Sequence, residues 1–127
     1  MEQVKEFIEK YSSKLSVGTS ISYTEAEKRS GEFLTALAQI TEWRHLFSAE
    51  KIKLLSIQTG VYAERMSLGT AKTVTENKLT AEASKEYIIA REALENIEND
   101  ISYLKSYYDI FLNAHLFYRA MAKEGRE

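Results

Sequence analysis

A regular hydrophobic repeat dominates the C-terminal part of the sequence. Its positions alternate in steps of three and four residues without a break, at Tyr87, Ala90, Leu94, Ile97, Ile101, Leu104, Tyr108, Phe111, His115, Tyr118 and Ala122. This spacing places the side chains along one side of an α-helix, as in the seam of a coiled coil. We expect a helix over residues 84–122, roughly 58 Å long at about 1.5 Å per residue. So long a rod in a chain of 127 residues favours a homo-oligomer.

The hydrophobic pattern of the N-terminal half predicts further helices. Residues 1–15 carry apolar side chains at helical spacing, from Val4 to Leu15. A linker rich in Ser, Thr and Gly follows over residues 16–23. Thr24 and Glu27 form a capping-box pattern that opens a helical segment over residues 24–66. Because Ser48 is a good N-cap, this segment is predicted as a helical hairpin whose second helix begins there, or as one kinked helix.

Two more start signals precede the long helix. Thr73 and Glu76 form a second capping-box pattern, which predicts a short helix over residues 73–82, and Ser84 is placed to cap the long one. No segment alternates over enough residues to predict a strand. The sequence therefore predicts an all-α helical bundle in a single domain, residues 1–127, with the helix of about 84–122 as its oligomerisation spine.

The long helix changes character near its middle. Up to Asp100 its apolar residues keep to one side, whereas from Ile101 onward the helix is apolar or aromatic on nearly every side. A helix of that kind needs cover on every side, which a chain this short obtains from other subunits. Membrane insertion is the rival explanation, and Lys105 and Asp109 count against it. We expect an oligomer interface formed by Tyr103, Leu104, Tyr107, Tyr108, Phe111, Phe117 and Tyr118.

Composition narrows the class of protein. The chain has no proline, which suits long helices, and no cysteine, which excludes disulfides, thiolate metal sites and cysteine nucleophiles. The N-terminus lacks the apolar run of a signal peptide, and no stretch approaches the ~20 apolar residues of a membrane span. We expect a cytoplasmic protein without membrane contact, located in the bacterial host cytoplasm if a phage encodes it.

Patterns for catalysis, cofactors and metals are nearly absent. The sequence has neither a glycine-rich phosphate loop nor a serine nucleophile on a tight turn. His115 lies on the hydrophobic seam and His45 near a helix end, where structural roles suffice. Glu92, Glu95 and Glu98 lack the Glu-x-x-His pairing of helical di-metal sites. We expect no enzymatic activity, cofactor, metal or small-molecule substrate.

Charge is distributed unevenly along the chain. The net charge is −2, but residues 51–85 carry six basic and three acidic side chains, a local excess of +3. The simplest interpretation of this basic excess is a solvated surface of mixed charge. If a ring of subunits repeats the segment, a basic track for nucleic acid results. The candidate DNA-binding residues are Lys51, Lys53, Arg65, Lys72 and Lys78.

Residues 62–119 add a family resemblance. The matching elements are Lys72 and Thr73, Glu76, Ala81, Ser84 with Tyr87, then Tyr103, Leu104, Lys105 and Asp109. In this layout the segment resembles the UvsY-type recombination mediators of tailed phages. The resemblance implies a homo-oligomeric helical protein that binds single-stranded DNA and helps a recombinase displace a single-strand-binding protein. The basic residues named above come from the charge distribution and not from the resemblance.

A second class of function fits the acidic flanks and the apolar helix equally well. It is a helical protein-interaction module, such as a phage inhibitor of a host defence complex or an assembly factor. Charge reversal at Lys53 and Lys72 separates the two hypotheses, because it abolishes DNA binding and need not affect protein binding. An enzyme is the third class and has the least support.

Overall fold

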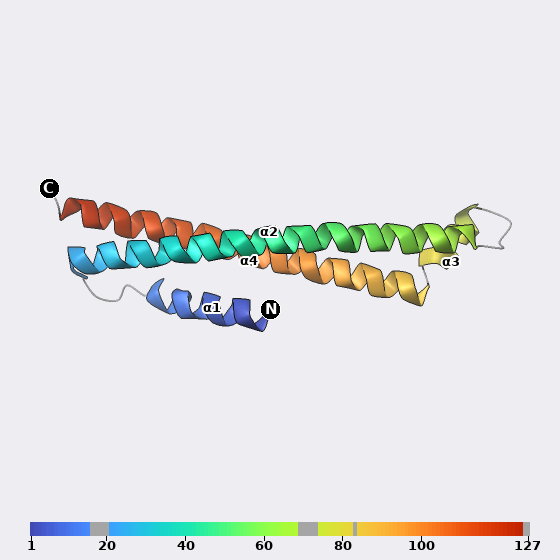
Figure 1. Cartoon of the computed structure of the whole chain (residues 1–127), viewed down its shortest axis with the longest axis horizontal. Coiled ribbons are helices and arrows are strands. Elements are labelled where there is room, and N and C mark those ends of the chain that lie inside the picture. Colours follow the sequence, from blue (N-terminus) through green and yellow to red (C-terminus); the bar gives the residue numbers. More distant parts are fainter. Residues whose placement is uncertain (16–20, 69–73, 83, 126–127) are drawn as a thin grey trace. The chain divides into compact units, whose positions relative to one another are not determined.

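Nearly all of the described chain is helical (Figure 1). The structure is a computed structural model that describes residues 1–15, 21–68, 74–82 and 84–125. Helix α1 spans Glu2–Ser12 and continues as a 3-10 turn over Ser13–Leu15, α2 spans Tyr23–Ser67, α3 Val74–Glu82 and α4 Lys85–Glu124. Within these ranges there is no strand, and the predicted all-α class is confirmed.

Helix α4 is the long helix expected from the hydrophobic repeat. It begins one residue after Ser84, whose Oγ accepts a hydrogen bond from the Tyr87 backbone N–H at 3.3 Å, as expected of an N-cap. All eleven positions of the repeat are buried or half-buried. The periodicity therefore identified the inward side of α4 correctly along its length.

Helix α2 runs without interruption where a helical hairpin was one expectation. Ser48 lies inside the helix, so the expected second start at that residue is wrong. The residues around it are mostly good helix formers, and neither glycine nor proline stands there to stop the helix. The cap is also displaced: Ser22 Oγ, rather than Thr24, accepts the hydrogen bond, from the Glu25 N–H at 3.1 Å. Thr73, the other predicted cap, lies outside the described residues.

The chain divides into two compact units, and each is described by itself. The first unit comprises Met1–Arg44 and Ser102–Glu127, and the second comprises His45–Ile101. Helices α2 and α4 each contribute one part to either unit. The prediction of a single domain stays a prediction.

The first unit has an aromatic core. It contains α1, the first part of α2 and the last part of α4 (Figure 1). Phe33 of α2 lies at its centre, with ring centroids 5.4 Å from Phe111 and 5.9 Å from Tyr118, both in α4. Tyr11 of α1 lies 6.3 Å from both phenylalanine rings. Three helices thus share one cluster of rings, in which burial and ring contacts both contribute stability.

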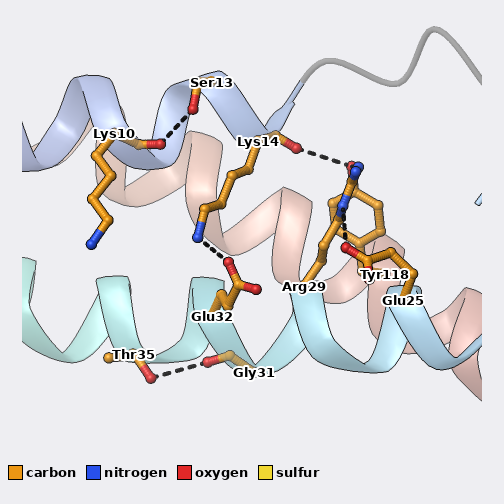
Figure 2. A network of polar contacts seen from close by, with 9 residues as sticks. All are labelled: Lys10, Ser13, Lys14, Glu25, Arg29, Gly31, Glu32, Thr35 and Tyr118. Carbon is orange, nitrogen blue, oxygen red and sulfur yellow. Dashed lines mark hydrogen bonds and ion pairs between the residues drawn. The ribbon is translucent and has the colours of Figure 1, made fainter.

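A polar network closes one side of this core (Figure 2). Arg29 donates a hydrogen bond to the Tyr118 hydroxyl at 3.2 Å, and that hydroxyl donates to the Lys14 carbonyl at 3.4 Å. Lys14 in turn forms an ion pair with Glu32 of α2. The hydrogen bond to Tyr118 is the main cause that raises the pKa of Arg29. The network connects the end of α1 to α2 and α4, and it satisfies the polar tip of a buried tyrosine.

The second unit has a smaller core. It contains the rest of α2, the short helix α3 and the first part of α4. The two long helices run antiparallel here, because Lys51 pairs with Glu98 while Arg65, farther along α2, pairs with Glu86. Among the residues of this unit that the structure describes, the buried side chains are Ala81, Ala90 and Leu94. Large apolar side chains remain exposed, among them Ile52, Leu55, Ile57, Val74, Leu79 and Ile89.

A matched pair of leucines tests the orientation of α2 in the first unit. Leu37 is 5% exposed and Leu34, one turn earlier, is 55% exposed. We expect Leu37→Ala to lower the free energy of unfolding by about 2–5 kcal/mol, because it leaves a cavity in the core. Leu34→Ala should change it by less than about 0.5 kcal/mol. Urea denaturation followed by circular dichroism measures both, and equal losses would contradict the assigned burial.

The position of the α2 cap is testable in the same way. Ser22→Ala should cost about 1 kcal/mol of unfolding free energy, because the Glu25 N–H loses its acceptor. Thr24→Ala should cost little, since Thr24 lies within the first turn and alanine is the better helix former. The reverse order in urea denaturation would restore the cap at Thr24.

Candidate nucleic-acid interface

One side of α2 in the second unit carries basic, amide and aromatic side chains in a row. Lys51, Gln58, Tyr62 and Arg65 follow one another at steps of seven, four and three residues, which places them on the same side of the helix. All four are half-buried. We call this set the α2 stripe, and along the helix axis it extends for roughly 21 Å from first to last residue.

The two basic residues of the α2 stripe form ion pairs with α4. Lys51 Nζ lies 3.7 Å from Glu98 Oε1, and Arg65 Nη2 lies 2.6 Å from Glu86 Oε1. All four side chains are more than a third exposed. Surface pairs of this kind contribute about 0–1 kcal/mol each, because water screens them. A phosphate group can therefore compete with either glutamate for its basic partner.

A pocket of about 270 Å³ lies between these ion pairs along α2. Its lining residues are Gln58, Thr59 and Tyr62 from α2, Lys78 and Glu82 from α3, and Tyr87 from α4. The rings of Tyr62 and Tyr87 have centroids 5.7 Å apart and planes inclined at 54°. Three helices thus bring an aromatic pair, an amide, a carboxylate and an amine to one opening.

The structure separates the five predicted DNA-binding residues. Lys51 and Arg65 belong to the α2 stripe, and Lys78 lines the pocket from α3. Lys53 is exposed and, two residues after Lys51, lies on the opposite side of α2. Lys72 falls outside the described residues.

The local basic excess is offset within the second unit. Residues 45–101 carry nine acidic and seven basic side chains, a net charge of 7 − 9 = −2. The acidic residues of the first part of α4 are Glu86, Glu92, Glu95, Glu98 and Asp100. A broad positive field for steering a polyanion is therefore missing from this unit.

Three of the seven residues of the predicted oligomer interface lie in the core of the first unit itself. Leu104, Phe111 and Tyr118 are fully buried in its core, which gives them a role different from the predicted one. Tyr103, Tyr107 and Tyr108 are half-buried. Burial is the main cause that raises the pKa of Tyr103, and Tyr107 and Glu9 add to it. Phe117 is 52% exposed and stays available for contact with another chain.

Sequence reasoning missed the pocket. Tyr87 is an inward position of the repeat and part of the family resemblance, and the spacing that predicts the helices gives Tyr62 no role beyond helix packing and does not single out Gln58. The spacing from Lys51 to Arg65 was a usable signal for the α2 stripe. No signal in the sequence indicated that α3 would place Lys78 and Glu82 beside the two tyrosines, because that is a tertiary contact.

His115 has a structural role in the first unit. Its Nδ1 lies 2.8 Å from the Ser30 carbonyl, which can only accept, and 3.1 Å from Ser30 Oγ.

In the described part of the chain, no three potential metal ligands cluster. None of the described helices combines the length and hydropathy needed to cross a membrane.

Comparisons with protein-family models, curated proteins and solved structures found no match. The resemblance to the UvsY-type mediators thus stays a prediction from the sequence. The features of the structure that bear on function are the α2 stripe, the pocket and the exposed apolar side chains.

Proposed function

We propose that this protein is a non-enzymatic, homo-oligomeric recombination mediator that binds single-stranded DNA and assists the loading of a recombinase. The α2 stripe carries the proposal. Tyr62 lies between its two cations and forms an aromatic pair with Tyr87 of α4. Proteins that bind single strands combine phosphate contacts with base stacking in this way. Lys51 and Arg65 contact phosphates, and Lys78 adds a third contact from α3.

The ion pairs of the α2 stripe are compatible with this role. Glu98 and Glu86 hold Lys51 and Arg65 beside α4 in the free protein. A nucleic-acid strand that lies along the α2 stripe replaces each carboxylate by a phosphate, and the released glutamate returns to water easily because it is already partly exposed. The net charge of −2 in the unit makes one copy a weak binder, and several copies in one oligomer raise the avidity.

Exposed apolar side chains of the first unit support self-association. Ile110, Leu116 and Phe117 of α4 are each more than two-fifths exposed. Ile110 and Phe117, seven residues apart, lie on the same side of α4, and exposed apolar side chains that gather on a surface mark sites of contact with other chains. These residues fall in the half of α4 for which the sequence predicts the interface.

A protein-interaction module is the second candidate, and the apolar surface of the second unit favours it. Ile52 and Val74 are 69% and 74% exposed, and Leu55, Ile57, Leu79 and Ile89 add to that surface. Under this hypothesis the apolar residues bind a protein partner and the α2 stripe has no nucleic-acid role. An inhibitor of a host defence complex or an assembly factor would act in this way.

The role of the α2 stripe is tested by neutralising its two basic residues and, as a control, one lysine outside it. We expect Lys51→Gln and Arg65→Gln to weaken binding of a fluorescent single-stranded oligonucleotide, because each removes a cation that faces a phosphate. The slope of log K against log salt should fall by about 0.7 for each phosphate that the variant no longer neutralises. Lys53→Gln, on the opposite side of α2, is the control with the same charge change. Fluorescence anisotropy at several salt concentrations measures all three.

Neutralising a glutamate that competes with the phosphate should raise the affinity for the oligonucleotide instead of lowering it. Glu86→Gln should strengthen binding by about fivefold, since it frees Arg65 and removes a competing charge worth about 1 kcal/mol near the surface. Glu64→Gln, exposed on the far side of α2, changes the net charge equally and should have a smaller effect. The absence of DNA binding by the intact protein at low salt would leave the protein-interaction module as the surviving candidate.

The self-association surface is tested by paired substitutions in the two units. We expect the Leu116→Ser, Phe117→Ser double variant to lower the molar mass measured by light scattering, because it removes exposed apolar area from α4 of the first unit. The Ile52→Ser, Ile89→Ser variant removes similar area from the second unit and should leave the mass unchanged. A monomeric wild-type protein would contradict the oligomer, and the reverse pattern would move the interface to the second unit.

A further inference from the structure

We propose that the pocket between α2, α3 and α4 of the second unit binds a single nucleobase of a DNA strand, and that it prefers bases with an exocyclic amino group. The inference rests on the proposed function and names the part of the ligand that this site recognises. The volume of about 270 Å³ is below the roughly 300–1,000 Å³ of pockets for drug-sized ligands, which suits one base.

The tyrosine pair is suited to stacking on its outer surface. The 5.7 Å between the centroids of Tyr62 and Tyr87 is less than the roughly 7 Å that a planar base would need to enter between them, twice the contact distance of carbon atoms. A base therefore stacks against one ring while the second ring supports the first from behind. Both rings are half-buried, so their positions are held by packing and part of their surface still reaches the pocket.

The polar residues of the pocket determine which base edge fits. The Glu82 carboxylate can only accept hydrogen bonds, and the Gln58 amide can both donate and accept. The Thr59 hydroxyl already donates to the Leu55 carbonyl at 2.9 Å, so towards a ligand it also acts as an acceptor. Two of the three groups thus require donors. Cytosine, adenine and guanine present an amino group, whereas the one donor of thymine lies between two carbonyl oxygens that repel a carboxylate.

Lys78 supplies the phosphate contact beside the base. It is exposed on α3, and among the described residues neither Lys78 nor Glu82 takes part in an ion pair. Arg65 lies one turn beyond Tyr62 on the α2 stripe. Lys78 in the pocket lining and Arg65 one turn along α2 are therefore the cations available to the phosphates that flank the base.

Two pyrimidine oligonucleotides of equal length, oligo-dC and oligo-dT, test the site in fluorescence anisotropy at low salt. We expect the full-length protein to bind oligo-dC more tightly. Tyr62→Leu and Tyr87→Leu should each weaken oligo-dC binding about fivefold or more, the loss expected when base stacking on an aromatic ring is removed. Tyr62→Phe keeps the ring and should bind within about twofold of wild type. Tyr23→Leu, an exposed tyrosine of the first unit, is the control.

Glu82→Gln tests the edge recognition on its own. It keeps the shape of the side chain and adds a donor, so we expect it to bring the affinities for oligo-dC and oligo-dT to within about twofold of each other. Circular dichroism checks that each variant keeps its helices. If a leucine variant loses them, Glu82→Gln and Tyr62→Phe decide the result, because both changes conserve size.

The outcomes separate this inference from the proposed function. Failure of the wild-type protein to bind either oligonucleotide overturns both. Binding that the folded leucine variants leave unchanged overturns the base pocket and retains the DNA-binding proposal. Equal affinity of wild type for the two oligonucleotides, or an unchanged preference in Glu82→Gln, overturns the preference for amino-bearing bases.

Discussion

The antiparallel contact between α2 and α4 is the constraint on which the other features depend. An isolated helix is marginal in water, and its stability comes mainly from packing its apolar side. The repeat in α4 finds that packing against α2 in both units: Phe111 against Phe33 in the first, and Tyr87 against Tyr62 in the second. The difference between the units arises from what else covers the pair. Helix α1 completes the aromatic core of the first unit, whereas the nine residues of α3 cover much less of the second.

Charge in the second unit has two consequences that oppose each other. Glutamates of α4 pair with Lys51 and Arg65 across the two helices and add weakly to the contact between α2 and α4. The same glutamates cancel the basic excess that the sequence shows over residues 51–85. Under the proposed function, nucleic-acid binding at this unit depends on exchange of carboxylate for phosphate at single positions, and the exposure of the pairs keeps the free-energy penalty of that exchange small.

Much of the fold could be predicted because it depends on local spacing. The inward side of α4 and its cap at Ser84 follow from periodicity and one hydrogen-bonding side chain. The helical hairpin with a break at Ser48, one of the two expectations, failed because a single capping residue is outweighed by neighbours that mostly favour helix. Periodicity also shows which side of a helix is buried, but it does not show which element covers that side. Phe111 was therefore expected at an interface between subunits, whereas it packs against Phe33 in the first unit. The pocket could not be predicted, since it joins three helices through tertiary contacts.

The contrast between the aromatic residues of the two units explains why the tyrosine pair of the second unit, and not the aromatic cluster of the first, can contact a ligand. In the first unit four aromatic rings pack against one another, those of Tyr11, Phe33, Phe111 and Tyr118. The hydroxyl of Tyr118 accepts a hydrogen bond from Arg29. These buried rings leave no exposed face for a ligand to contact. In the second unit, two tyrosines meet at the edge of a thin core and line an opening with polar side chains. Ligand-binding elements are commonly the less stable parts of a protein, because completed packing leaves no surface to offer. The incomplete core of the second unit is thus the physical reason to expect recognition there.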